Sequence, residues 1–111
     1  MSSSHEPVYW DSLGHTLLAA TGYNVSLPIG TTDWAVINIS GGTLYAAGSG
    51  ATLATGATSS VPIPTATSFE GKGQSLFVGN LTGAGLAVVV AWRRPGRQPD
   101  MNAGTATFTA L

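Results

Sequence analysis

The chain has 111 residues, no cysteine, a net charge of −1 at pH 7 and only 8% charged residues. A chain of this length builds one hydrophobic core, so we expect one domain. The charge balance argues against non-specific nucleic-acid binding, which requires a basic face, and the missing cysteines exclude disulfides and thiolate metal sites.

The first fifteen residues are predicted to form an N-terminal arm, because the chain opens on a Ser-rich terminus. Tyr9 and Trp10 place two large aromatic side chains next to each other in this arm. They either strap the arm onto the edge of the domain or anchor it in a neighbouring subunit, since Tyr and Trp are favoured at interfaces. Residues 16–21 are then expected to form a first strand or a short helical turn.

Residues 23–27 alternate apolar and polar side chains, which is typical of a half-buried strand. Tyr23, Val25 and Leu27 are expected to face the core. A second, well-buried strand is predicted over residues 34–40. The Gly-Gly pair that follows predicts a tight hairpin into a strand over residues 43–47.

The middle of the chain, residues 48–60, holds only small side chains and one Leu, and is expected to be a linker loop or a contact loop that orders in an assembly. Two prolines confine residues 61–64 to an edge strand. Shorter strands are expected over residues 67–70 and 74–78.

Leu86 to Trp92 form an unbroken, Val-rich apolar run, which favours a central strand covered on both faces. Residues 95–111 form either a C-terminal arm or a last strand, because residues 105–111 alternate again. We therefore expect an all-β fold, a small antiparallel β-sandwich or jelly roll over residues 16–94, with extended arms at both ends and no internal repeat.

The surface of this domain is expected to be covered in part by other proteins. A soluble monomer normally keeps a well-charged surface, and this chain has Gly, Ser and Thr in its place. Residues 1–7 lack the basic and apolar regions of a signal peptide, and no apolar run approaches the length of a membrane span. We expect synthesis in the cytosol and neither a membrane nor a nucleic-acid partner.

Few residues are candidates for catalysis or metal binding. His5, Glu6, Asp11 and His15 are close in sequence, but they follow no recognised ligand spacing. No nucleophile elbow and no phosphate-binding loop occurs. We therefore expect a protein that is not an enzyme and holds no cofactor or metal. Three Asn-x-Ser/Thr sequons are interpreted as a product of the Ser/Thr-rich composition.

Arg93, Arg94 and Arg97 make up three of the four basic residues. Such a cluster is either a solvated turn that ends a strand or a binding site for an acidic partner surface or a phosphate. As a hypothesis, these arginines form part of a subunit contact.

From Trp34 onward the order of segments resembles that of a known class of proteins. Residues 34–45 read Trp-Ala-Val-Ile-Asn-Ile-Ser-Gly-Gly-Thr-Leu-Tyr, and a Thr/Ser/Gly-rich stretch, Val-Pro-Ile-Pro-Thr, Ser-Leu-Phe-Val-Gly and the Val run follow. Over about residues 23–94 this resembles small virion proteins of tailed bacteriophages, namely capsid decoration (cement) proteins and β-modules of fibres and spikes.

The resemblance implies a β-sandwich without catalytic residues that binds to a shell or to itself, commonly as a trimer. Arms at its ends would tie neighbours together, with Phe108 and Leu111 as apolar pegs for a neighbouring groove. The first expectation is a capsid decoration protein that bridges capsomers in a virion assembled in the bacterial cytoplasm, its partner being the major capsid protein. The alternatives are a tail, baseplate or fibre-base module, and a carbohydrate-binding module that stacks sugars on Trp10 or Trp34.

Overall fold

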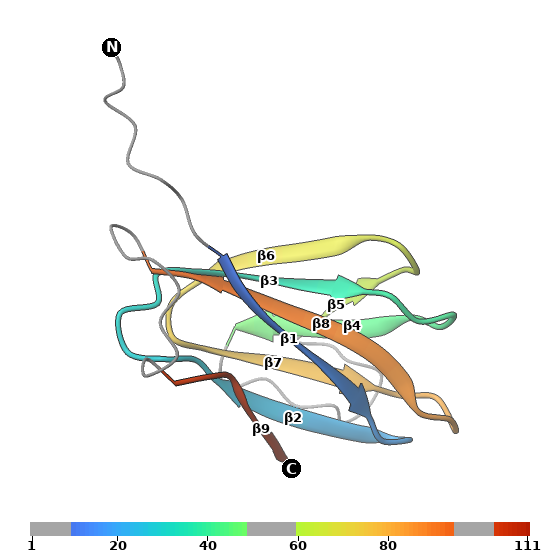
Figure 1. Cartoon of the computed structure of the whole chain (residues 1–111). Helices are drawn as coiled ribbons and strands as arrows, with labels where there is room; N and C mark the ends of the chain where they lie inside the picture. The colour runs from blue at the N-terminus through green and yellow to red at the C-terminus, as the bar shows by residue number, and fades with distance from the viewer. Residues whose placement is uncertain (1–9, 49–59, 95–103) are drawn as a thin grey trace.

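The strands pack into two antiparallel sheets because most of them place alternate side chains on one face, and these faces meet in a common core (Figure 1). The computed structural model describes residues 10–48, 60–94 and 104–111, which contain strands and turns and no helix. The strands are β1 (Trp10–Leu17), β2 (Thr21–Ser26), β3 (Asp33–Asn38), β4 (Leu44–Gly48), β5 (Val61–Ile63), β6 (Ser68–Lys72), β7 (Ser75–Asn80), β8 (Leu86–Arg93) and β9 (Thr107–Ala110).

One sheet has four strands in the order β1-β8-β3-β6, and the other has five in the order β5-β4-β7-β2-β9. The Val-rich strand β8 lies between β1 and β3, which confirms its predicted central place. Strand β5 forms an edge of its sheet, as the prolines of residues 61–64 predict. The predicted antiparallel sandwich is therefore the observed fold.

The core lies between the two sheets and draws on both. Tyr23, Val25 and Leu27 are buried in it while Asn24 and Ser26 are exposed, as the alternation of residues 23–27 predicts. The buried cluster consists of Leu17, Tyr23, Val25, Leu27, Trp34, Val36, Leu44, Ala46, Ile63, Leu76, Val78, Val88, Val90, Trp92 and Ala106.

The predicted hairpin at Gly41-Gly42 is wrong, because β3 and β4 belong to different sheets. Asn38, which is fully buried, causes the chain to turn a corner instead. Its Nδ2 donates to the carbonyls of Gly42 (2.6 Å) and Ile63 (2.8 Å). Its Oδ1 accepts from the backbone N–H (2.9 Å) and the hydroxyl (2.7 Å) of Ser40. These bonds satisfy the buried amide and direct the chain from one sheet to the other.

A second corner of the same construction lies at Asn80, between β7 and β8. The Nδ2 of this fully buried residue donates to the carbonyls of Ala84 (2.7 Å), Leu18 (3.1 Å) and Leu17 (3.2 Å). Its Oδ1 accepts from the backbone N–H (2.9 Å) and the hydroxyl (2.7 Å) of Thr82. The strand-corner-strand unit is thus repeated, contrary to the prediction of no internal repeat.

Two of the three sequons are therefore structural features. Asn38 and Asn80 have no exposed surface, and the Ser or Thr two residues later is bonded to the Asn side chain in each corner. A glycan cannot be attached to either residue in the folded chain. Among the three sequon asparagines, Asn24 of β2 alone is exposed.

The predicted boundary at the N-terminal end of the domain differs from the observed one. Residues 10–15 belong to β1, which pairs with β8 from Trp10 opposite Arg93 to Leu17 opposite Leu86, so they are part of the sandwich. The expected strand or helical turn over residues 16–21 is instead the end of β1, a connection over residues 18–20 and the first residue of β2. At the other end β9 forms a last strand. The arm up to residue 9, the loop over residues 49–59 and residues 95–103 lie outside the described residues.

Among the residues that the structure describes, no helix is long and apolar enough to cross a membrane.

Candidate interaction surface

The structure separates the residues that sequence reasoning proposed for an interface. Tyr9 and Arg97 lie outside the described residues. Trp10 begins β1 and is 45% exposed, and Leu111 follows β9 and is 64% exposed. These two apolar side chains are available to a partner, whereas the remaining three residues, Arg93, Arg94 and Phe108, contact other parts of this chain.

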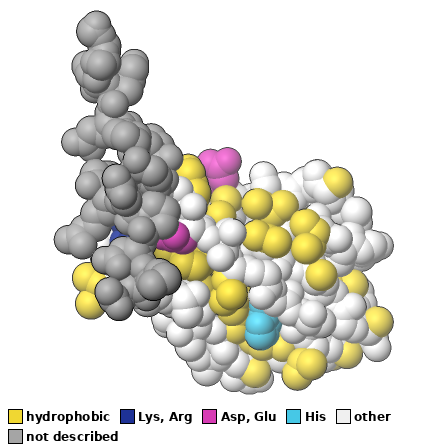
Figure 2. Space-filling model, in the orientation of Figure 1, with side chains coloured by type: hydrophobic (Ala, Val, Ile, Leu, Met, Phe, Trp, Pro, Cys, Tyr) yellow, Lys and Arg dark blue, Asp and Glu magenta, His cyan; other side chains and the backbone are white. Residues whose placement is uncertain are grey.

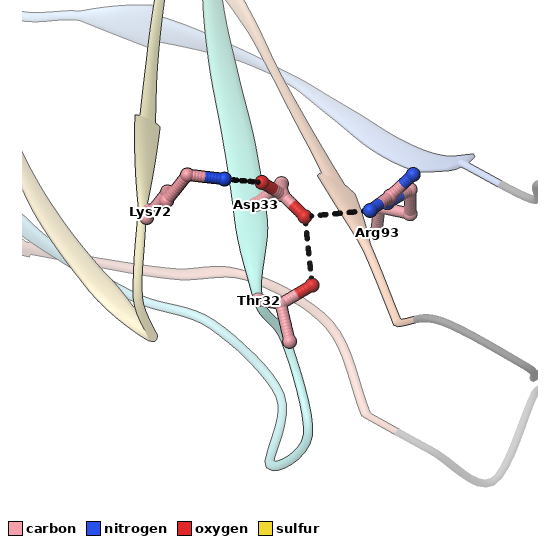
Figure 3. A network of polar contacts seen from close by, with 4 residues as sticks. All are labelled: Thr32, Asp33, Lys72 and Arg93. Carbon is pink, nitrogen blue, oxygen red and sulfur yellow. Dashed lines mark hydrogen bonds and ion pairs between the residues drawn. The ribbon is translucent and has the colours of Figure 1, made fainter.

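Arg93 is held at the end of β8 by Asp33, the first residue of the neighbouring strand β3 (Figure 3). One carboxylate oxygen of Asp33 accepts from Arg93 Nη2 at 3.0 Å and from the Thr32 hydroxyl at 2.8 Å. The other carboxylate oxygen accepts from Lys72 Nζ at 2.9 Å. The hydrogen bond from Lys72, followed by that from Thr32, lowers the pKa of Asp33 from 3.8 to about 2. This network joins β3, β6 and β8 at one end of the sheet.

Arg94 is buried, with 6% of its surface exposed. Its Nη2 lies 3.6 Å from Oδ2 of Asp11 in β1. Its aliphatic stem lies beside Gly30 in the connection between β2 and β3. The guanidinium therefore stabilises the contact among three segments of its own chain, because a buried cation needs a paired charge.

Phe108 stacks on His15, with ring centroids 4.2 Å apart and planes inclined by 12°. Tyr23 meets both rings edge-on, at 5.8 Å from His15 and 6.2 Å from Phe108. His15 belongs to β1 at the edge of one sheet and Phe108 to β9 at the edge of the other. The three rings close this side of the sandwich, and Phe108 is partly buried in that contact.

Sequence reasoning missed a surface, the outer face of the sheet β1-β8-β3-β6. Side chains of β8 that alternate with its core residues point away from the core, and the same holds for the other three strands. The register aligns them in rows across the sheet. We call outer face the set Ser12, Gly14, Thr16, Ala35, Ile37, Ser68, Glu70, Ala87, Val89 and Ala91. Its border consists of Trp10 and the charged residues Asp33, Lys72 and Arg93.

The centre of the outer face is flat, apolar and almost without charge. Ile37, Ala87 and Val89 are half-buried, and Ala35 and Ala91 are small enough that neighbouring side chains shield them. Figure 2 shows hydrophobic side chains gathered on this face, with the charged ones toward one end. No second layer among the described residues covers it, so the expectation that both faces of β8 are covered is met by the core on one side only.

The signal for this face is present in the sequence but needs the register to be recognised. Ala87, Val89 and Ala91 alternate with the core residues of the same strand. The unbroken apolar run therefore contributes to both the core and the outer face, and the two sets of residues look alike in the sequence. Ala35 and Ile37 repeat the pattern in β3, which the register places directly beside β8.

The described residues contain no group of three or more side chains able to hold a metal ion. Trp34 is 2% exposed, so it cannot stack on a sugar, and the same is true of Trp92 beside it in the sheet. Among the aromatic side chains named for sugar binding, only Trp10 is exposed.

A scan against models of protein families finds no match to the chain, and a search of curated proteins finds no similar sequence.

Proposed function

We propose that this chain is a non-enzymatic structural protein of a virion, a capsid decoration protein that stabilises the head by bridging capsomers. The single observation that carries the proposal is the outer face of β1-β8-β3-β6, an apolar and nearly uncharged sheet surface that no other described segment covers. Apolar faces of this kind are typical of contact sites between proteins.

The outer face has the properties of a surface that packs against another sheet. Sheets pack face to face at about 10 Å through small and β-branched side chains, which Ala35, Ile37, Ala87, Val89 and Ala91 supply. Its border carries both signs of charge, through Asp33, Lys72 and Arg93. Because a border of mixed sign can complement another copy of itself, we propose that this face joins copies of the chain. That three copies assemble is what the resemblance to phage virion proteins implies.

The assignment to a virion comes from the resemblance of residues 23–94 to small phage structural proteins. The low charge of the whole chain supports it, since most of the surface of a shell component lies against neighbours. The alternative is a tail, baseplate or fibre-base module. Such a module also has a low-charge surface that lies against neighbours, but it is present in fewer copies per particle.

The test is made on purified particles of the virus that encodes the chain. Quantitative mass spectrometry should find the protein in them in numbers comparable to the major capsid protein. Particles without the protein, obtained by deleting its coding sequence, should release their DNA at a lower temperature than complete particles. Equal heat stability contradicts the decoration function, and a few copies per particle favours the tail module.

A further inference from the structure

The two ends of the sandwich differ sharply in charge. The charged residues that the structure describes lie in one half: Asp11, Asp33, Glu70, Lys72, Arg93 and Arg94. Within the part of the chain that the structure describes, the opposite end is built from four connections, residues 18–20, 39–43, 64–67 and 81–85, which we call the tip. None of the four contains a charged residue. In Figure 1 they lie together at the right-hand end, and Figure 2 shows no charged side chain at that end of this face.

Three large aliphatic side chains project from the tip. Leu18 is 62% exposed, Ile39 57% and Leu81 39%. Ile39 and Leu81 occupy the same position in the two corners, directly after the buried Asn38 and Asn80. The backbone at Leu18 is fixed as well, because its N–H donates to the Tyr23 hydroxyl at 2.8 Å and its carbonyl accepts from the Asn80 side chain.

The fold does not require these aliphatic side chains. Each corner is held by hydrogen bonds among Asn, the Ser or Thr two residues later, and backbone groups, and the intervening side chain takes no part in them. A polar residue there would fit the corner equally well and would leave less apolar surface in water. The chain nevertheless has an exposed aliphatic side chain at both corners, which indicates an apolar partner.

The chemistry of the tip restricts that partner to a protein. Its four connections hold no Lys or Arg, which binding to nucleic acid or to anionic lipid requires. They also hold no Trp, Tyr or Phe, which would stack on sugars or anchor in a lipid interface. The tip presents aliphatic side chains among Ser, Thr, Gly and backbone groups. An uncharged protein surface with shallow apolar pockets is complementary to such a surface.

The size of the tip argues against a second copy of the chain as the partner. The three side chains expose on the order of 300 Å², whereas a stable complex buries about 800 Å² on each partner. A single tip-to-tip contact is therefore too small to hold a dimer. A small contact is sufficient when several linked copies bind one particle, because linking binding sites raises the overall affinity above that of a single site.

We propose that the tip is the end by which the protein docks on its particle, with Leu18, Ile39 and Leu81 inserted into apolar pockets of an uncharged protein surface. The inference rests on the proposed function, in which that surface belongs to the capsid shell. The outer face then remains for contacts between copies.

The absence of cysteine makes a direct test possible. One variant carries Ile39→Cys and a matched control carries Ile29→Cys, each labelled with an environment-sensitive dye. Ile29 is also aliphatic and 88% exposed, but it lies in the connection between β2 and β3 at the charged end. On addition of particles that lack the protein, the dye at position 39 should shift to the blue and the dye at position 29 should not. A shift at position 29 alone overturns the proposal.

Affinity gives a second, independent measurement. The variant L18S/I39S/L81S should bind these particles about a thousandfold more weakly, since burying each of the three aliphatic side chains contributes on the order of tenfold. Ile29→Ser should bind like the wild type. If the wild type binds the particles and the triple variant binds them equally well, the docking role of the tip is wrong but the proposed function stands. A wild type that does not bind overturns the proposed function and the tip together.

Two further measurements exclude other partners. The triple variant should keep the native mass of the wild type in sedimentation; loss of self-association would make the tip a contact between copies and overturn the proposal. The wild type should not bind vesicles of phosphatidylcholine, and binding that the triple variant loses would assign the tip to lipid. If the triple variant does not fold, the two labelled variants decide the question.

Discussion

At the scale of single residues, this fold depends on two buried amides. Asn is suited to the corner because its side chain carries both donors and acceptors. In the corner at Asn38 it bonds to backbone groups of its own connection and to the last residue of β5. In the corner at Asn80 it bonds to its own connection and to the end of β1. Removing either amide leaves buried backbone carbonyls without a donor, which costs more than the lost bond itself.

Replacing Asn38 or Asn80 by Ala should therefore lower the free energy of unfolding by about 2–4 kcal/mol. Urea denaturation measures this loss. Asn24→Ala is the matched control, since Asn24 is exposed in β2, and it should change stability by less than about 0.5 kcal/mol. Equal effects at all three positions would mean that the corners do not determine stability.

Asp33 gives the fold a defined sensitivity to acid. Its pKa in the folded chain is about 2, below the ordinary 3.8, so folding favours its charged form. The stability that it contributes is fully present above about pH 4 and is lost as the pH falls from there toward 2. The effect is small, because Lys72 is largely exposed and exposed ion pairs are weak.

The variant D33N should be slightly less stable than the wild type at pH 6 and should approach it as the pH falls toward 2. Thermal unfolding of both proteins at several pH values measures the difference. A difference that is constant from pH 6 to pH 2 would contradict the lowered pKa of Asp33.

At the scale of elements, the pairing of β3 with β6 depends on a glycine. Gly71 lies opposite Trp34, and a Cβ added at Gly71 would overlap the indole ring of Trp34. The ring of this buried Trp thus lies across the backbone of β6, where only a glycine leaves room for it.

Gly71→Ala should accordingly destabilise the domain by about 2 kcal/mol or more, since overpacking displaces a core side chain. Gly14→Ala in β1 is the control, because its Cβ would meet no atom closer than 4.0 Å. That change should be neutral or slightly stabilising, as it restricts the unfolded chain. Chemical denaturation measures the free energy of unfolding of the two variants. A Gly71→Ala variant as stable as the wild type would show that β6 moves easily to make room for the added methyl group.

The same scale shows what the sequence could and could not predict. Alternation identified β2, and a Val-rich run identified β8 as central, because both signals are local. The corner at Asn38 was mistaken for a hairpin, since a Gly-Gly pair between apolar runs looks the same in either case. The outer face was missed because its residues come from four strands whose register no local pattern fixes. Arg94 and Phe108, proposed for a neighbour, meet Asp11 and His15 from distant segments of the same chain.

At the scale of the whole molecule, the uncovered outer face predicts self-association. The wild type should have the native mass of a trimer, about 34 kDa from three chains of 11.2 kDa. Val89→Lys places a charge in the centre of the outer face and should give the mass of a single chain. Ser26→Lys, on an exposed position of the other sheet, should leave the trimer intact. Light scattering coupled to gel filtration measures all three, and a trimeric Val89→Lys variant would place the contact elsewhere.

The pairing of β1 with β8 has a consequence for how the chain folds during synthesis. Leu17 pairs with Leu86 and Trp10 with Arg93, so β1 cannot pair until residues about 70 positions later have been made. Contacts between such distant segments form slowly, because a long loop has to close first. The four-stranded sheet can thus be completed only after Arg93 has been made, and a chain stalled before Leu86 would leave β1 and β3 without the strand that joins them.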